Sequence, residues 1–342
     1  MSTRKLNRQQ RWRIDKIQEE RIARLARREA RAHSLLEEGG LAGERPGLVL
    51  AHYGTQVHVE SLPDDPQGPC LQRCHRRANL PALATGDRVL WQPAALEDGI
   101  GVVSALLPRR SLLERPDGHG HSKPIAANID QLLIVIAPQP TTRDLSIDRY
   151  LVAAHAAALQ PLLVLNKRDL AEAADLARLD RYRHLGYDCL SLSARSGELD
   201  ELRQILPGRV SAFVGLSGVG KSSLVNALLP DIQQVTRELS SHSGLGQHTT
   251  TTARLFHLPG GGDLIDSPGI REFGLGLLTG EQILAGFPEI ASWRGRCRFR
   301  NCHHEHEPGC AFVAAVAAGE LSQERFASLR SLLADGDAAT DD

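Results

Sequence analysis

The feature that most constrains the fold is a short loop in the second half of the 342-residue chain. Residues 215–222 read Gly-Leu-Ser-Gly-Val-Gly-Lys-Ser, which matches the pattern GxxxxGK[ST]. The apolar run Val210–Val214 before it predicts a buried strand, and Ser223–Leu229 after it favours a helix. This context indicates a phosphate-binding loop within an α/β fold whose sheet is mainly parallel. A glycine-rich turn that binds nothing is the alternative, and it leaves the flanking strand and helix unexplained.

Each part of this loop has an expected role. Its glycines let backbone N–H groups turn toward phosphate oxygens, and the following helix adds its positive N-terminal end. Lys221 should reach the β- and γ-phosphates, while the Ser222 hydroxyl should ligate Mg²⁺. We expect the loop and the residue after it to contact the nucleotide: Gly215, Leu216, Ser217, Gly218, Val219, Gly220, Lys221, Ser222 and Ser223.

A second motif, at residues 166–169, indicates which base is bound. It follows the apolar run Leu162–Leu165, and open α/β sheets bind ligands at such strand ends. A carboxylate at Asp169 can accept from both N1–H and the exocyclic amine of guanine, a donor pair that adenine lacks. Residues 193–194 follow the next expected strand, Asp188–Leu192, and could place a backbone N–H on guanine O6. Alone, the first motif could be a charged helix start, but together with the phosphate loop it predicts GTP. The expected guanine-site residues are Asn166, Lys167, Arg168, Asp169, Ser193 and Ala194.

Two further segments are expected to respond to the γ-phosphate. Residues 266–269, Asp-Ser-Pro-Gly, end the expected strand Leu264–Ile265, so Asp266 can hold the Mg²⁺ shell through water and the Gly269 N–H can contact the γ-phosphate. Residues 244–252, Gly-Leu-Gly-Gln-His-Thr-Thr-Thr-Thr, suit a switch whose threonine closes on Mg²⁺. Thr250 is the expected ligand, with the register open by one residue. A Ser/Thr-rich surface loop is the alternative.

The order of these motifs is diagnostic. In the commonest GTPases the phosphate loop comes first, whereas here residues 166–169 and 193–194 precede residues 215–222. A circular permutation can preserve the assembled site because each motif stays at the end of its own strand. The same permutation attaches the C-terminal part of the chain directly to the switch at residues 266–269.

The residue after Gly269 predicts slow hydrolysis by the protein alone. Many GTPases place a water-orienting Gln there, but this chain has Ile270, whose side chain neither donates nor accepts a hydrogen bond. We hypothesise that a binding partner orders the switch around His248, which could itself orient water; alternatively His248 only packs against or caps the loop. The residues expected to act in hydrolysis are Lys221, His248, Thr250, Asp266 and Gly269, and the expected Mg²⁺ ligands are Ser222, Thr250 and Asp266.

A cluster of cysteine and histidine near the C-terminus predicts a metal site. Three cysteines and a histidine with the spacing C-x₄-C-x-H-x₅-C supply a tetrahedral set that Zn²⁺ takes readily, and four protein ligands make such a site structural. Without a signal peptide, a reducing compartment favours zinc over disulfides. The expected ligands are Cys297, Cys302, His304 and Cys310. His303 or His306 could instead supply the imidazole.

The N-terminal third has the pattern of a separate β domain. Five short strand-like runs lie between residues 47 and 107, separated by turns rich in Gly and Pro, and they fit an OB-fold barrel, with an SH3-like barrel as the alternative. Cys70 and Cys74 lie in one of these runs and suit packing better than ligation. Near residue 129 the pattern changes to apolar runs that alternate with helical segments, and Ala311–Leu333 is again helical.

The net charge of −1 conceals a basic N-terminal arm. Residues 1–33 carry eleven Arg or Lys against four acids, a composition suited to contacting nucleic-acid phosphates. A solvated helix is the alternative, with Glu20 and Arg24 spaced to pair along it. No apolar run approaches the roughly 20 residues that a membrane helix needs, and we find no lipidation motif, so a membrane partner is not expected.

Taken in this order, the motifs identify a family. The chain resembles the ribosome small-subunit-dependent GTPase A family over approximately residues 40–330, through residues 166–169, 215–223, 248–251, 266–269 and the 297–310 cluster. The resemblance implies a circularly permuted bacterial GTPase with an N-terminal OB-fold and a C-terminal zinc domain. It implies late maturation of the small ribosomal subunit, rRNA contacts and hydrolysis stimulated by that subunit, and it favours His304 as the zinc ligand.

We therefore expect a basic arm at residues 1–38, an OB-fold at 39–110, a linker at 111–128, a circularly permuted α/β P-loop GTPase domain at 129–280, and a mostly helical zinc domain with an acidic tail at 281–342. The expected protein is a cytoplasmic monomer that hydrolyses GTP to GDP and phosphate with Mg²⁺, carries one structural Zn²⁺ and binds the small subunit and its rRNA. The alternative is an RNA-binding assembly factor that uses GTP mainly as a structural ligand.

Overall fold

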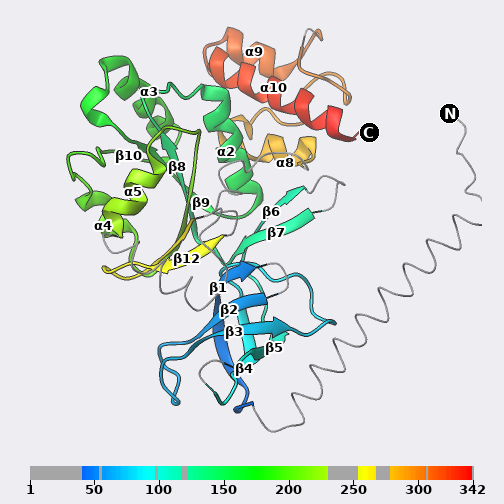
Figure 1. Ribbon diagram of the computed structural model, residues 1–342. Coiled ribbons are helices and arrows are strands. Elements are labelled where there is room, and N and C mark those ends of the chain that lie inside the picture. The colour runs from blue at the N-terminus through cyan, green and yellow to red at the C-terminus, as the bar shows by residue number, and fades with distance from the viewer. Residues whose placement is uncertain are drawn as a thin grey trace, which may run out of the picture.

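The computed structural model describes residues 41–53, 56–96, 99–116, 122–229, 253–266, 278–305 and 307–340 (Figure 1). The basic arm lies outside these ranges, as do His248, Thr250, Gly269, Ile270 and the alternative zinc ligand His306. Among the helices so described, none combines the length and the apolar character needed to span a bilayer.

The central domain is built on a mainly parallel sheet. Its parallel strands are β8 (Gln131–Ile136), β9 (Gln160–Leu165), β10 (Asp188–Ser191), β11 (Val210–Val214) and β13 (Asp263–Asp266). They lie in the order β10-β9-β8-β11-β13, and β12 (Arg254–His257) pairs antiparallel with β13. The mainly parallel sheet was predicted from the apolar runs. The strand β12 was not predicted.

Both faces of this sheet are buried, as the side chains of β8 show. Leu132, Ile134 and Ile136 pack on the face covered by α2 (Asp144–Ala156) and α3 (Ala173–His184). Leu133 and Val135 pack on the opposite face, covered by α4 (Asp200–Ile205) and α5 (Lys221–Leu228). Burial on both faces explains why these strands are continuous apolar runs rather than alternating ones.

The N-terminal domain is a closed five-stranded barrel. Its strands are β1 (Arg45–Tyr53), β2 (Gln56–Ser61), β3 (Leu71–Arg76), β4 (Arg88–Gln92) and β5 (Gly101–Leu106). The order β1-β2-β3-β5-β4 closes through a β1–β4 pairing, which confirms the OB-like barrel. Trp91 and Cys74 are fully buried in its core, so Cys74 packs as expected. A Cβ on Gly47 would lie 2.4 Å from Trp91 Nε1, so β1 passes the indole only because position 47 is glycine.

A β-hairpin lies between the barrel and the central sheet (Figure 1). Its strands β6 (Leu112–Pro116) and β7 (Ser122–Ala127) pair antiparallel within residues 111–128, where we expected a linker. The polar residues between Arg115 and Ser122 conceal the hairpin in the sequence, because they interrupt the apolar positions on which strand prediction depends.

The C-terminal domain is mostly helical and packs against α2. It contains α8 (Gly280–Ala285), η2 (Pro288–Ile290), α9 (Ala311–Ala317) and α10 (Gln323–Thr340). Its apolar side chains, including Phe287 and Leu329, belong to the same core as those of α2. A Cβ on Gly286 would lie 2.8 Å from Val152 Cα, so the two domains are in close backbone contact there.

Candidate nucleotide-binding and metal sites

The phosphate loop lies between β11 and α5, at the carboxyl edge of the parallel sheet. Gly215 has φ of 136°, and a Cβ there would lie 2.2 Å from Val135 O. Gly220 has φ of 98°, and a Cβ there would lie 2.3 Å from Asn166 Nδ2. Both positions therefore require glycine, for backbone conformation and for space. The strand–loop–helix context inferred from the sequence is present.

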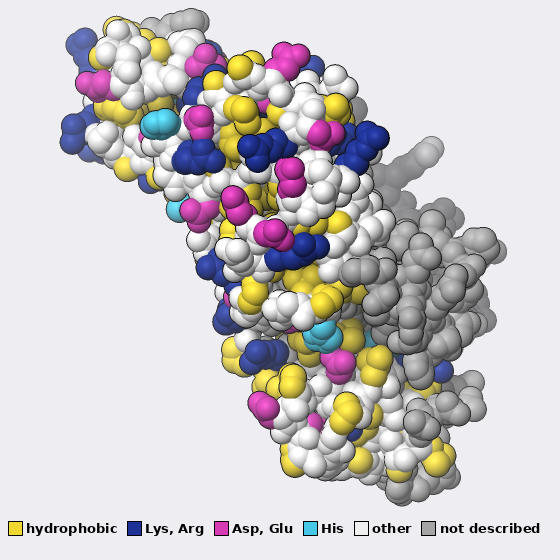
Figure 2. Space-filling view, turned by 90° about the vertical axis from the view of Figure 1, so that its left-hand side faces the viewer, with side chains coloured by type: hydrophobic (Ala, Val, Ile, Leu, Met, Phe, Trp, Pro, Cys, Tyr) yellow, Lys and Arg dark blue, Asp and Glu magenta, His cyan; other side chains and the backbone are white. Residues whose placement is uncertain are grey.

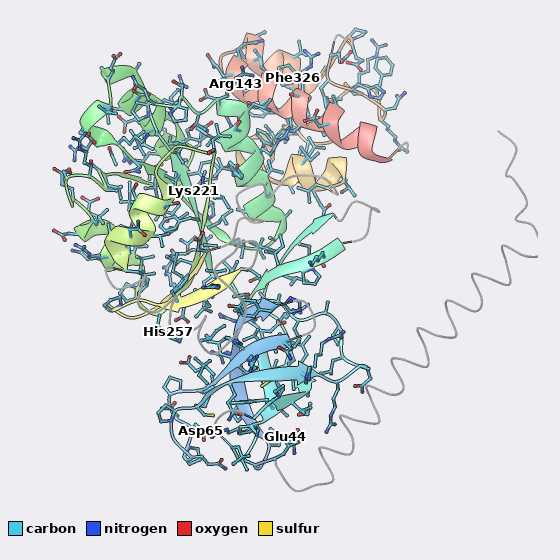
Figure 3. All side chains as sticks on the ribbon, viewed as in Figure 1. Glu44, Asp65, Arg143, Lys221, His257 and Phe326 are labelled. Atoms are coloured by element: carbon cyan, nitrogen blue, oxygen red, sulfur yellow. The ribbon has the colours of Figure 1, made fainter. Side chains whose placement is uncertain are left out.

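Lys221 is buried at the centre of this loop (Figure 3). Its Nζ donates to the carbonyl oxygens of Gly215 and Leu216, both at 2.6 Å. These bonds place the ammonium group inside the loop, where the β- and γ-phosphates of a nucleotide are expected. Phosphate oxygens would compete with the two carbonyls for its protons.

Asn166 joins the base-reading motif to the phosphate loop. Its side chain is at the end of β9 and only 2% exposed, and its Nδ2 donates to Val219 O at 3.0 Å. Its Oδ1 accepts from the Ala194 N–H at 3.1 Å, so one amide side chain links all three motifs. The Ala194 N–H is thus already hydrogen-bonded, and a contact with guanine O6 would have to share or replace that bond.

Lys167 makes a second link to the phosphate loop. Its Nζ donates to Gly218 O at 2.8 Å and to Gln139 O at 2.7 Å, and its backbone is left-handed with φ of 59°. The sequence placed Asn166 and Lys167 at the base. Their role in holding the phosphate loop depends on contacts between segments more than 50 residues apart, which the sequence does not reveal.

The carboxylate expected to read guanine is oriented by its neighbour. Asp169 lies in the short helix η1 (Arg168–Leu170), and its Oδ1 accepts from Ser193 Oγ at 2.6 Å. This hydrogen bond holds the pKa of Asp169 below its ordinary value, so the carboxylate is ionised and acceptor-only at neutral pH. An acceptor-only group suits the two donors of guanine.

Asp266 ends β13 at the same edge of the sheet. The parallel register pairs Ala212 of β11 with Ile265, so Asp266 lies beside the strand end that leads into the phosphate loop. The half-buried Asp266 carboxylate and the exposed Ser222 hydroxyl are oxygen donors, which suit Mg²⁺. The other expected Mg²⁺ ligand, Thr250, lies outside the described residues.

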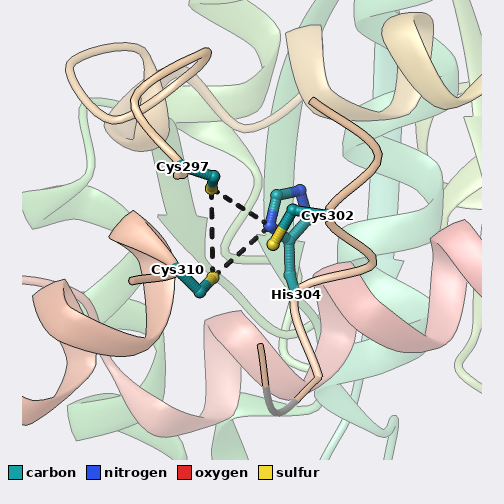
Figure 4. Close-up of side chains that lie close together, drawn as sticks. All are labelled: Cys297, Cys302, His304 and Cys310. Atoms are coloured by element: carbon teal, nitrogen blue, oxygen red, sulfur yellow. Dashed lines mark hydrogen bonds between the residues drawn. The ribbon is translucent and has the colours of Figure 1, made fainter. Parts of the chain in front are cut away.

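The four expected zinc ligands meet in the C-terminal domain (Figure 4). The thiols of Cys297, Cys302 and Cys310 and the imidazole of His304 present ligand atoms within 4.8 Å of one another. Cys297 Sγ lies 4.0 Å from Cys310 Sγ, and His304 Nδ1 lies 3.6 and 3.5 Å from these two sulfurs. A tetrahedral Zn²⁺ with Zn–S bonds of about 2.3 Å needs ligand separations of about 3.8 Å, so the donor set fits zinc.

Comparisons of the chain with known proteins agree with this geometry. A family model described as RsgA GTPase matches residues 106–276. A protein from Pseudomonas aeruginosa called small ribosomal subunit biogenesis GTPase RsgA is 56% identical over 339 residues, which is 98% of each chain. The protein of the same name from Azotobacter vinelandii is 54% identical over 339 residues, again 98% of each chain. The chain belongs to the RsgA GTPase family.

Solved structures of similar proteins support the permuted architecture of this RsgA GTPase. YjeQ from Thermotoga maritima superposes with a TM-score of 0.67 at 31% identity, covering 86% of this chain and 99% of that one. YloQ, described as a circularly permuted GTPase, superposes with a TM-score of 0.65 at 28% identity, covering 86% and 96%. The circular permutation predicted from the order of the motifs is therefore confirmed. The chain is a GTP hydrolase of this family.

Proposed function

We propose that this GTP hydrolase acts in the maturation of the small ribosomal subunit, to which it binds through protein and rRNA contacts. The observation that carries the nucleotide chemistry is the pair of hydrogen bonds made by Asn166, because this buried side chain joins the guanine motif to the phosphate loop at a single sheet edge. The two relatives named for small ribosomal subunit biogenesis, matched over 98% of their lengths, support the partner.

Within the site, the roles follow from position. Asp169, oriented by Ser193, selects guanine, and the N–H groups of the phosphate loop together with Lys221 bind the phosphates. Ser222, Asp266 and Thr250 would hold Mg²⁺, which neutralises phosphate charge when bound. Gly269, which lies outside the described residues, would contact the γ-phosphate, so that the segments around Thr250 and Gly269 would respond to hydrolysis.

The cysteine cluster holds a structural Zn²⁺ in this proposal. All four positions are taken by protein side chains, which leaves no site for a water or substrate. Burial lowers the pKa of His304, so its imidazole is neutral and available to a metal. Cys297 and Cys302 would hold the ion together with Cys310, which precedes α9, and the first residue of α9 donates its backbone N–H to Cys297 Sγ at 3.4 Å.

We propose that hydrolysis is slow until the subunit binds. Ile270 cannot orient the attacking water, so the bound subunit orders the switch around His248 and supplies that alignment. Partner-supplied elements contribute about 10³–10⁵-fold in other GTPases, which is enough to separate a resting from an active state. We propose a monomer that works in the cytoplasm.

Ile270 also favours a second candidate function. A protein that lacks a water-orienting side chain could bind rRNA with GTP as a structural ligand and turn it over only incidentally. Lys221 and Asp266 favour hydrolysis instead, because tight binding alone does not require a metal-shell carboxylate at the end of β13.

The experiment is GTP turnover by the purified protein with and without small ribosomal subunits. We expect strong stimulation that Lys221→Ala abolishes and His248→Ala reduces. Unchanged stimulation in the His248 variant would remove that residue from the mechanism. Tight GTP and subunit binding without stimulation would instead favour the structural-ligand alternative.

A further inference from the structure

The barrel and the central sheet form one continuous eleven-stranded sheet, joined at β12 (Figure 1). On one side β12 pairs with β13 along its whole length, and on the other Arg254 pairs with Ala51 of β1. A single residue pair is a short ladder, so the side chains around it must supply much of the attachment.

Thr85 of the barrel supplies the first of these contacts. It is fully buried, and its Oγ1 donates to Ala253 O at 2.9 Å, directly before β12. Its neighbour Gly86 is equally close to the sheet, since a Cβ there would lie 3.2 Å from Ile265 Cδ1 of β13. The barrel therefore contacts both strands of the β12–β13 hairpin.

His257 supplies the second contact, at the other end of β12 (Figure 3). Its Nε2 lies 2.7 Å from Glu60 Oε2 on β2, and its Nδ1 lies 2.6 Å from Asp263 Oδ1 on β13. A neutral imidazole carries one proton, so only the imidazolium can donate to both carboxylates. The hydrogen bonds to Asp263 and Glu60 raise the pKa of His257 to about 10, which keeps the ring charged at neutral pH.

The bridge shares a strand with a residue of the expected Mg²⁺ shell. Asp263 begins β13, and the same strand ends at Asp266, which we assign to the Mg²⁺ shell. Both carboxylates lie on the four-residue strand β13, so three peptide units of one strand connect Asp263 to Asp266. Glu60, in contrast, belongs to the barrel.

We propose that His257 is a positioning residue, which fastens the β12–β13 hairpin to Glu60 of the barrel so that barrel position and nucleotide state are coupled. In the free protein the coupling runs from the nucleotide to the barrel. On the small subunit, and here the inference depends on the proposed function, contacts made by the barrel are passed through Glu60 and His257 to Asp266. A merely stabilising ion pair would add to the strength of the junction without making either end respond to the other.

The test measures amide hydrogen exchange in the free full-length chain, with GDP and with a non-hydrolysable GTP analogue. In the wild-type protein we expect the change of nucleotide to alter exchange in β1 and β2 by about threefold, the scale of a surface ion pair. Glu60→Gln and His257→Leu should each reduce this ratio to about one, and the double variant should add nothing further, as expected for two ends of one interaction. Arg183→Gln is the control, because Arg183 pairs with Asp180 on α3, away from the junction.

Two results would overturn the inference: a wild-type barrel that does not respond to the nucleotide, or variants that respond as the wild type does. Turnover on subunits separates this result from the proposed function. If subunits stimulate GTP turnover by the wild type and by the Glu60 and His257 variants equally, His257 has no role in activation and the proposed function stands. If subunits do not stimulate turnover but hydrogen exchange in the barrel still responds to the nucleotide, the proposed subunit role is wrong and the coupling through His257 stands.

Discussion

Arg325 of α10 and Asp148 of α2 form an ion pair between the C-terminal domain and the central domain, although 177 residues separate them. Asp148 also accepts from Tyr182 Oη at 2.8 Å, and the Arg325 guanidinium lies 4.4 Å above the Phe287 ring. Both charged side chains are buried. Arg325 Nε also donates to Glu289 Oε1 of η2 at 2.6 Å, so one arginine pairs with Asp148 across the interface and with Glu289 inside its own domain.

Removal of one partner of this pair should weaken the domain interface strongly. Arg325→Met leaves a buried carboxylate without its counter-ion, which typically costs about 3–5 kcal/mol in unfolding free energy. The double variant Asp148→Leu/Arg325→Met removes the fully buried Asp148 charge as well and leaves only the carboxylate of Glu289, whose side chain is 15% exposed, without its partner, so it should cost less than the single change. Urea unfolding of the three proteins checks this order, and a double variant less stable than Arg325→Met would contradict it.

The same two helices offer a matched control. Arg149 of α2 and Asp335 of α10 also pair, at 2.5 Å, but both side chains are exposed to solvent. Such a pair contributes about 0–1 kcal/mol, because water and salt screen it. Arg149→Gln should therefore leave the unfolding midpoint nearly unchanged, and a loss comparable to that of Arg325→Met would show that exposure is not what separates the two pairs.

The base preference should follow the donor and acceptor pattern of residue 169. Asp169→Asn replaces one acceptor oxygen with a donor amide, which no longer matches both donors of guanine but matches the donor and carbonyl of xanthine. We expect GTP affinity to fall by about 10²-fold or more and xanthosine triphosphate to bind better than GTP. Ser193→Ala, which only loosens the carboxylate, should cost about threefold to tenfold. Equilibrium binding of both nucleotides tests this, with Asp180→Asn on α3 as the control.

Metal removal should affect the C-terminal domain first. The cluster joins the loop at Cys297 to the start of α9 at Cys310, and Cys310 and Phe312 belong to the core shared with α2. We expect one zinc per chain, and we expect chelation or Cys302→Ser to release it and to loosen α9 and α10, because metal-binding energy is folding energy in such sites. Elemental analysis with circular dichroism measures both. Cys189→Ser, remote from the cluster, should retain the metal.

What the sequence could and could not reveal depends on the range of the interaction. The parallel strands, the strand–loop–helix of the phosphate motif and the Cys/His cluster are local patterns, and the structure has them within a few residues of where the sequence predicts them. The strand β12 was missed because its four residues begin with Arg254 and end with His257, and only pairing with β13 and β1 makes it a strand. The contacts of Asn166 and Thr85 join distant segments, so no local pattern marks them.

The junction at His257 should weaken at alkaline pH. The folded-state pKa is raised to about 10 from an unfolded value near 6.5, so the contribution of the charged ring to stability is complete below about pH 6.5 and is lost as pH rises through about 10. Because the His257 side chain is about half exposed, solvent screening should limit this contribution to unfolding free energy to about 1 kcal/mol or less. The stability difference between wild type and His257→Leu, measured by urea unfolding from pH 6 to about 10.5, should shrink over that window. A difference independent of pH would mean that the ring is not charged in the folded protein.

Gly220→Ala tests whether the link between the two nucleotide motifs matters for binding. The new Cβ would lie 2.3 Å from Asn166 Nδ2, at a backbone φ of 98° that alanine adopts only with strain. The Asn166 amide would have to move, which breaks its bonds to Val219 O and the Ala194 N–H together. We expect GTP affinity to fall by about tenfold to a hundredfold. Gly208→Ala is the matched control, since its φ of 73° is equally left-handed but its Cβ meets nothing within 4 Å. Equal losses of affinity in both variants would assign the effect to backbone strain alone and remove Asn166 from the argument.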